Sequence, residues 1–343
     1  MRATRWMTMA AIVVTVACGG DSAPRPKAAD AGPLKVGLLL DSLETERWQR
    51  DRDLFVARAE ELRAQVEVRT GDGTHETQLA AAGELLELGV KSLVLVPHDL
   101  ERAKEIVALA AAKNVPVISY DRLVRDADVA LYVSFDNVKV GRMQAEALLA
   151  AAPRGNYVLL GGSPTDNNAK LVRDGQLEVL KPAIESGAVR IVADPWVQNW
   201  DAALAKDETS AALKKARNVV AVVASNDATA SGAAEALSGA KLLGKVALSG
   251  QDADLAACQR IVSGTQTMTV YKPLKALARM AAGSAVSLAK GEAVDSLVKV
   301  NNGLKDVPAR LLEPISVDKR NIDVTVISDG YQTKDAVYQG KAN

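Results

Sequence analysis

Residues 219–229 read Val219-Val-Ala-Val-Val-Ala-Ser-Asn-Asp-Ala-Thr229, and this stretch decides the fold class. Its first six residues are all apolar, which is typical of a central strand in a parallel sheet that is covered on both faces. Ser, Asn and Asp follow at once, and these residue types favour the start of a helix. A buried strand that passes directly into a helix indicates an α/β protein.

Nine other short apolar runs also predict strands, and helical stretches lie between most of them. The runs are Lys35–Leu40, Val66–Thr70, Ser92–Val96, Val115–Tyr120, Ala130–Ser134, Asn156–Leu160, Arg190–Ala193, Lys245–Ser249 and Thr265–Val270. The helical stretches include Arg47–Leu62, Glu76–Leu88, Leu100–Lys113 and Ala169–Ile184. This alternation indicates parallel sheets built from strand–helix–strand units. Ten strands exceed one neat doubly wound sheet, so we predict two α/β lobes, each with a doubly wound parallel sheet.

The composition fits a globular protein of two ordinary domains. The chain has 343 residues, of which 48% are apolar and 24% charged, and this excludes disordered, collagen-like and disulfide-scaffold classes. Its 42 basic residues balance 42 acidic residues. Without a basic surplus, we expect no nucleic-acid partner.

The first 17 residues have the pattern of an export signal. Arg2 and Arg5 precede about a dozen mostly apolar residues, fewer than the roughly 20 that a membrane-spanning helix needs. Residues 15–19 read Thr-Val-Ala-Cys-Gly, which resembles a bacterial lipoprotein box. We predict a signal peptide over 1–17 and a lipidated Cys18. The alternative is an ordinary signal that is cut nearby and leaves a free cysteine.

Residues 18–33 combine the lipidated Cys18 with a flexible tether. The segment is rich in Gly, Ala, Pro and Asp and has no periodicity. Loss of the signal leaves 40 basic against 42 acidic residues, a net charge of −2. Lipidation of Cys18 leaves Cys258 without a partner, so we predict no disulfide.

Charged, amide and indole side chains follow seven of the predicted strands, where ligands bind in open α/β sheets. Carboxylates accept hydrogen bonds from hydroxyls, Arg and Lys donate them, and an indole covers the C–H face of a pyranose. The charges of the set balance, because it contains three acids and three bases: Asp121, Asp166 and Asp252 against Arg47, Arg122 and Lys272. The set predicts a neutral polyhydroxylated ligand, and it comprises Arg47, Trp48, Asp121, Arg122, Asp166, Asn168, Trp196, Trp200, Asn226, Asp252 and Lys272.

Each of these residues also has a purely structural interpretation. An Asp or Asn after a strand commonly caps the next helix, and Asn226, Asp227 and Asp252 are placed to do so. Arg47 lies in a charged run that suits a surface, and Trp196 and Trp200 could pack together as core. The coincidence at seven strand ends favours a binding site.

Other function classes lack their motifs. The chain has no nucleophile elbow, no phosphate-binding loop and no dinucleotide-binding glycine motif, and its only histidines, His75 and His98, are not spaced as metal ligands. Residues 250–254 lack the acidic spacing of a calcium loop. Paired Asp residues leave glycoside hydrolysis as an enzymatic alternative. We predict no enzyme, no cofactor and no metal. A sugar-responsive transcription regulator would need a helix-turn-helix where this chain has its export signal.

The candidate residues lie within longer motifs. These are Glu46-Arg-Trp-Gln-Arg-Asp-Arg-Asp53, Tyr120-Asp-Arg122, Ser134-Phe-Asp-Asn137, Gly161-Gly-Ser-Pro-Thr-Asp-Asn-Asn-Ala-Lys170, Ala224–Thr229, Ser249–Asp254, Gly264–Pro273 and Asn301–Pro308. In this order they resemble the D-xylose-binding proteins of bacterial ABC importers, in the periplasmic-binding-protein superfamily. The resemblance extends from Lys35 to about Gly330. It implies the type I fold, with two lobes joined by three hinge strands.

Carried over position by position, the resemblance implies ten sugar contacts. They are Arg47, Trp48, Asp121, Arg122, Asp166, Asn168, Trp200, Asn226, Asp252 and Lys272. Trp200 lies in a stretch, Val197–Ala216, that matches the family poorly, and Trp196 is its substitute. The implied lobes are 34–134 with 271–311, and 135–270 with 312–333, followed by a tail over 334–343. Residues 317–322 would begin the last helix.

Together these inferences describe an extracytoplasmic, lipid-anchored solute-binding protein, expected to be a monomer. Its lobes would close around a pentose pyranose, D-xylose, and deliver it to an ABC permease and its ATPase. The alternative is a sugar-sensing protein for a different monosaccharide that feeds a chemoreceptor or a sensor kinase. The same site would suit both.

Overall fold

A computed structural model describes residues 32–44, 46–296 and 298–339 of the chain. Its two main sheets are built mostly from parallel strands, with helices between most successive strands, so the predicted α/β class is confirmed. The predicted signal over 1–17, Cys18 and most of the tether lie outside the described residues. No helix in the described part of the chain is long and apolar enough to cross a membrane.

The first lobe consists of a seven-stranded sheet and its four helices. The strand order is β11-β12-β5-β4-β3-β1-β2, and every neighbouring pair is parallel except β11 with β12. The strands are β1 (Leu34–Leu40), β2 (Ala64–Thr70), β3 (Leu93–Leu95), β4 (Val117–Tyr120), β5 (Leu131–Phe135), β11 (Val298–Asn301) and β12 (Asp306–Leu312). The helices are α1 (Glu46–Glu61), α2 (His75–Glu87), α3 (Lys104–Ala111) and α9 (Leu274–Ala289).

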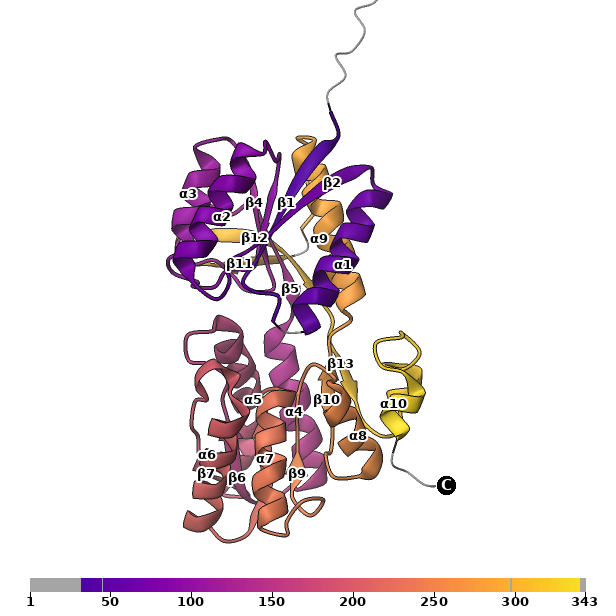
Figure 1. Ribbon diagram of the computed structural model, residues 1–343. Helices are drawn as coiled ribbons and strands as arrows, with labels where there is room; N and C mark the ends of the chain where they lie inside the picture. The colour runs from indigo at the N-terminus through magenta and orange to yellow at the C-terminus, as the bar shows by residue number, and fades with distance from the viewer. Residues whose placement is uncertain (1–31, 45, 297, 340–343) are drawn as a thin grey trace, which may run out of the picture. The chain divides into compact units, whose positions relative to one another are not determined.

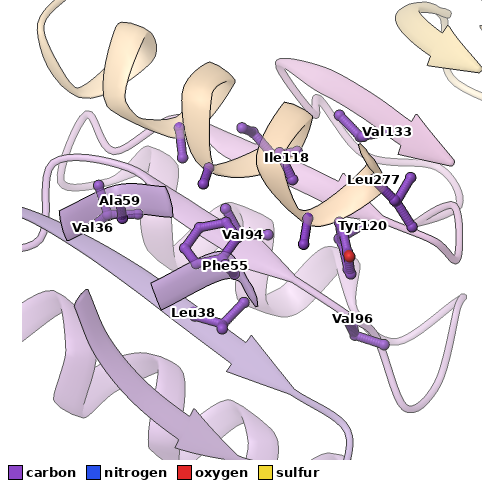
Figure 2. Close-up of a cluster of buried hydrophobic side chains, with 14 of the residues drawn as sticks. Val36, Leu38, Phe55, Ala59, Val94, Val96, Ile118, Tyr120, Val133 and Leu277 are labelled. Atoms are coloured by element: carbon purple, nitrogen blue, oxygen red, sulfur yellow. The ribbon is translucent and has the colours of Figure 1, made fainter. Parts of the chain in front are cut away.

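The helices of the first lobe cover both faces of its sheet, which explains why the central strands β3 and β4 are buried along their whole length. Helices α1 and α9 pack on one face, and α2 and α3 pack on the other (Figure 1). On the first face, Phe55 and Ala59 of α1 and Leu277 of α9 meet the strand residues of a buried cluster (Figure 2). Burial on both faces fixes the strands and their carboxyl ends, where the candidate residues begin.

The second lobe is built on a four-stranded sheet in the order β7-β6-β8-β9, with all pairs parallel. Helices α4 and α5 pack on one face, and α6 and α7 pack on the other. The strands are β6 (Gly155–Leu160), β7 (Val189–Ala193), β8 (Val219–Ala224) and β9 (Ala247–Leu248). The helices are α4 (Asn137–Ala151), α5 (Asn167–Glu185), α6 (Ala202–Lys215), α7 (Asp227–Gly239) and α8 (Leu255–Ser263), with a short 3-10 helix η1 (Gln198–Trp200). The opening stretch of the sequence analysis is therefore strand β8 and the start of α7.

Three segments connect the lobes. Strand β5 leads into α4, strand β10 (Thr269–Tyr271) leads into α9, and β12 leads into β13 (Ile315–Val317). Strands β10 and β13 pair antiparallel in a small sheet of their own. The chain thus leaves the first lobe, returns to it and leaves it again.

The C-terminal region differs from the expectation. No α-helix begins within 317–322, because Asp318 and Asn321 form a local turn: Asn321 Oδ1 accepts from the Asp318 amide at 2.9 Å. A single 3-10 turn, η2 (Ile322–Val324), follows. The last helix is α10 (Lys334–Tyr338), in the segment that the sequence analysis assigned to a tail. It packs on α8, and its Val337 is buried, so residues 334–338 of the expected tail are part of the second lobe.

Two residues at the crossings also lie on the other side of the expected boundaries. Phe135 ends β5 and packs in the core of the first lobe, and Tyr271 pairs with Ile315 in the small sheet. Strand β11, which the apolar pattern did not reveal, is an edge strand whose side chains are largely exposed. Its four residues, Val-Lys-Val-Asn, alternate apolar and polar, and this short alternation was the available sequence signal.

Candidate functional site

A cavity of about 360 Å³ is lined by residues of both lobes. All ten side chains named above as sugar contacts line it, although they come from seven separate places in the sequence. The structure therefore brings these ten residues together, and Trp196 alone of the predicted set does not line the cavity. Seven further residues complete the lining: Asn137, Val172, Asn199, Ala228, Gln251, Asp254 and Tyr331.

Helix α1 brings Arg47 and Trp48 to the cavity from its first turn. Arg47 pairs with the carboxylate of Asp121 through its Nη2 and lies 3.5 Å from Asp51 through its Nε. Trp48 is almost completely buried, and its ring lies near two guanidinium groups, 4.5 Å from the Cζ of Arg47 and 5.6 Å from that of Arg122. The two cations hold the indole in one orientation through cation–π attraction.

Asp121 follows β4 directly and adopts a left-handed conformation with φ +62°. Its amide donates to Val133 O at 2.8 Å, and its carbonyl accepts from the Tyr132 and Ser134 hydroxyls at 2.9 and 2.8 Å. These bonds to β5 hold the strained backbone in place, as is typical of functional positions. They turn the Asp121 carboxylate into the cavity.

Two residues of the second lobe both cap a helix and line the cavity. Asp166 Oδ1 accepts from the Asn168 amide at 2.9 Å at the start of α5, and Asn226 Oδ1 accepts from the Thr229 amide at 2.9 Å at the start of α7. The capping interpretation is thus correct for both and compatible with a place in the site. It is wrong for Asp227, which follows the N-cap Asn226 as the first residue of α7, and for Asp252, because Asp254 occupies the N-cap position of α8.

The three acids and three bases of the predicted set form three ion pairs. Arg47 pairs with Asp121, Arg122 Nε lies 3.9 Å from Asp166 Oδ2, and Lys272 Nζ lies 3.0 Å from Asp252 Oδ1. The first pair lies within the first lobe, and the second pair joins the two lobes. Burial alone would raise the pKa of Asp252, but Lys272 and Arg47 outweigh it and lower that pKa. Burial lowers the pKa of Lys272 more than its acidic neighbours raise it.

Two further acids, Asp51 and Asp41, form ion pairs with the bases Arg47 and Arg122 and were not among the predicted residues. Asp51 is 1% exposed, lies one helical turn after Arg47 and accepts a hydrogen bond from the Tyr120 hydroxyl. Its pKa is raised, because burial outweighs the effects of Arg47 and Tyr120. Asp41 accepts from Arg122 Nη1 at 2.8 Å and lies 2.8 Å from His98 Nδ1. The spacing of Arg47 and Asp51 on one helix face was the available sequence signal.

The structure distinguishes Trp200 from Trp196. Trp200 lines the cavity and lies against the backbone of Gly162, where an added Cβ would be 2.1 Å from its Cη2. Trp196 is 40% exposed and packs with Arg173, whose Cζ lies 5.3 Å from its ring, outside the cavity lining. Both Asn199 and Trp200 have positive φ, so the turn between β7 and α6 is an irregular one that sequence patterns do not specify.

The arrangement suits a small neutral ligand with several hydroxyl groups. It offers paired carboxylates as acceptors, Arg and Lys as donors, amides that do both, and an indole from each lobe. In the described part of the chain, no three His, Cys, Asp or Glu side chains are grouped to hold a metal ion.

The fold and the site define the class of protein. The family described as the periplasmic binding protein domain matches residues 36–293, and the chain belongs to this family. A solved carbohydrate transporter solute-binding protein from Chloroflexus aurantiacus, in complex with D-glucose, superposes with a TM-score of 0.83. It is 32% identical, and the match covers 88% of this chain and 98% of that one.

Curated relatives are more similar still. The D-xylose-binding periplasmic protein of Haemophilus influenzae is 52% identical over 306 residues, which cover 89% of this chain and 92% of the relative. The protein of the same name from Escherichia coli is 51% identical over 305 residues, with the same coverage. The family match over residues 36–293 includes the positions of all ten candidate residues.

Proposed function

We propose that this chain is an extracytoplasmic solute-binding protein that captures a pentose pyranose, D-xylose, and delivers it to an ABC importer. The observation that carries the proposal is the convergence of the three ion pairs, the amides and the two indoles on one cavity between the lobes. The names of the relatives in Haemophilus influenzae and Escherichia coli support D-xylose as the ligand.

The charges of the site suit an uncharged ligand for an electrostatic reason. Each base of the predicted set has an acid beside it, so these three pairs carry no net charge that would demand an ionic ligand. Sugar hydroxyls can enter between the partners as both donors and acceptors. The indoles of Trp48 and Trp200 then provide flat apolar surfaces for the C–H faces of the ring.

Calorimetric titration of the purified protein with xylose, glucose, arabinose, ribose and galactose tests the proposal. We expect xylose to bind with a micromolar or lower Kd, equivalent to about −8 kcal/mol or better, and more tightly than the other four. Flat titrations for all five sugars would rule out the proposal of a pentose ligand. Tighter binding of a sugar other than xylose would favour the alternative of a sensor for that monosaccharide.

The lipid anchor, the export signal and the monomeric state belong to the same proposal. Arg2, Arg5 and the apolar run before Cys18 support export and lipidation, and Cys18 would tether the lobes through residues 19–33. We expect labelled palmitate to be incorporated by the wild type and not by Cys18→Ala. Label on the variant would place the lipid elsewhere, and label on neither would support an ordinary cleaved signal. Light scattering with and without sugar would show one copy per particle.

A further inference from the structure

Tyr331 lines the cavity, although it follows the third crossing and lies outside every predicted set of site residues. It is half-buried and packs against two separate hydrophobic clusters, the core of the first lobe and the cluster beneath α8 and α10. The residue therefore meets both lobes at the cavity wall. A residue in this position changes the shape of the cavity directly.

The ring of Tyr331 is held on more than one side. The Cζ of Arg50, from α1, lies 4.7 Å from the ring centroid, and Arg50 Nη1 donates to Tyr331 O at 2.7 Å. The ring of Tyr271, from β10, lies 5.1 Å away at an interplanar angle of 47°. The next residue, Gln332, donates to Ala253 O at 3.2 Å. These contacts leave the phenol ring little freedom to move aside for a larger ligand.

Most residues that line the cavity have charged or amide side chains or are the two tryptophans, so few other residues could limit the size of the ligand. Among the lining residues, only Val172, Ala228 and Tyr331 are neither charged nor amide nor indole side chains. Ala228 is small, and Val172 is part of the core of the second lobe. Burial, followed by Asp252 and Asp254, raises the pKa of the Tyr331 phenol, which is consistent with a neutral ring at all working pH values.

We propose that Tyr331 is the wall that limits the site to a pentose. This inference rests on the proposed function and deepens it. A pentopyranose and a hexopyranose such as glucose differ at one ring carbon, where the hexose carries an extra hydroxymethyl group. An apolar methylene of the pentose would lie against the ring of Tyr331, and the hydroxymethyl group of a hexose would collide with it. A pocket that distinguishes two ligands by one such group changes the ratio of their affinities by roughly 10- to 200-fold.

The test compares the Kd values for D-xylose and D-glucose in the full chain and three variants at the wall. Tyr331→Ala removes the ring, Tyr331→Leu removes it while keeping the segment packed, and Tyr331→Phe removes only the hydroxyl. Tyr338→Ala is the matched control, because this tyrosine lies in the same C-terminal segment and packs on the same cluster but not on the cavity. Val172→Ala tests the competing wall.

We expect the ratio of the glucose Kd to the xylose Kd to fall at least about tenfold in Tyr331→Ala and Tyr331→Leu. The ratio should stay at the wild-type value in Tyr331→Phe, Tyr338→Ala and Val172→Ala. An unchanged ratio in both Tyr331→Ala and Tyr331→Leu overturns the inference, as does a fall confined to Val172→Ala. A wild type that binds no xylose ends the proposed function itself, whereas xylose binding with an unchanged ratio in the variants ends only the inference about Tyr331.

Discussion

Asn168 Nδ2 donates to Asp121 Oδ1 at 2.9 Å, and this hydrogen bond joins the two lobes inside the candidate site. Asn168 Oδ1 in turn accepts from Asn137 Nδ2 at 3.0 Å, so the start of α4 is tied to the same contact. Asp121 accepts from Arg47 with its other carboxylate oxygen. The carboxylate of Asp121, at the end of β4, thus accepts hydrogen bonds from donors in both lobes.

Asp121→Ala should therefore weaken sugar binding severely while the protein stays folded. The change strands the donors of Arg47 and Asn168 in a closed site, and each lost bond to a charged group costs about 1.5–3 kcal/mol. We expect the xylose Kd to rise at least roughly 10- to 150-fold in calorimetry. Asp53→Ala, an exposed carboxylate of α1, is the control and should bind normally. Unchanged affinity in Asp121→Ala would remove this residue from the site.

Trp200→Ala and Trp196→Ala should behave differently. Trp200 lines the cavity, so its loss should raise the xylose Kd at least about tenfold and reduce the fluorescence change on binding. Trp196 lies on Arg173 outside the cavity, so its loss should leave the Kd close to the wild-type value. Intrinsic fluorescence titrations measure both effects. The reverse pattern would make Trp196 the second stacking residue.

Gly175→Ala should destabilise the second lobe and disturb the site. Helices α4 and α5 cross so closely that a Cβ on Gly175 would lie 1.9 Å from Val138 O. The helices would have to separate, which costs about 1–3 kcal/mol, and they carry Asn137 and Asn168 into the site. We expect a lower free energy of unfolding in urea and weaker xylose binding.

Gly83→Ala is the matched control for this prediction. Gly83 also lies inside a helix, α2, but nothing lies within 4 Å of an added Cβ there. The substitution should raise the free energy of unfolding by about 0.5–1 kcal/mol and leave the Kd unchanged. Equal effects of the two substitutions would show that helix propensity, not the close crossing, decides the outcome.

Asp252 should contribute to stability in a defined pH range. Its pKa in the folded protein is lowered, because Lys272 and Arg47 outweigh burial, so its contribution is present above the ordinary pKa of about 3.9. That contribution is lost as the pH falls through the lower folded value. Burial, Asp254 and Asp252 raise the pKa of Asp227, so its contribution has the opposite sign: it is present below about pH 4 and is lost as the pH rises.

Urea unfolding between pH 7 and pH 2.5 measures these contributions. Below about pH 4, the wild type should lose unfolding free energy more steeply than the double variant Asp252→Asn/Lys272→Met, which removes both charges and strands neither. Because the contribution of Asp227 changes only above about pH 4, the low-pH range isolates Asp252. Parallel curves for the two proteins in that range would contradict the assignment.

Much of the fold and the candidate site could be predicted from local sequence. The continuous apolar run 219–224 predicted β8 at its observed bounds, and the capping residues Asp166 and Asn226 lie where the helices begin. The missed features depend on contacts between distant residues. Asp51 is indicated locally only by its i,i+4 spacing from Arg47, and Tyr331 has no local pattern, so the packing of the C-terminal segment alone brings Tyr331 to the site.

The sequence by itself determined the alternation of buried strands and helices and the polar residues at the strand ends, because period and capping are properties of neighbouring residues. It also supplied the three acids and three bases. Only the tertiary structure decided which acid meets which base, that Trp200 and not Trp196 reaches the cavity, and that Tyr331 forms part of its wall. These outcomes depend on how the chain crosses three times between lobes, and pairing over such separations is set by packing rather than by any local pattern.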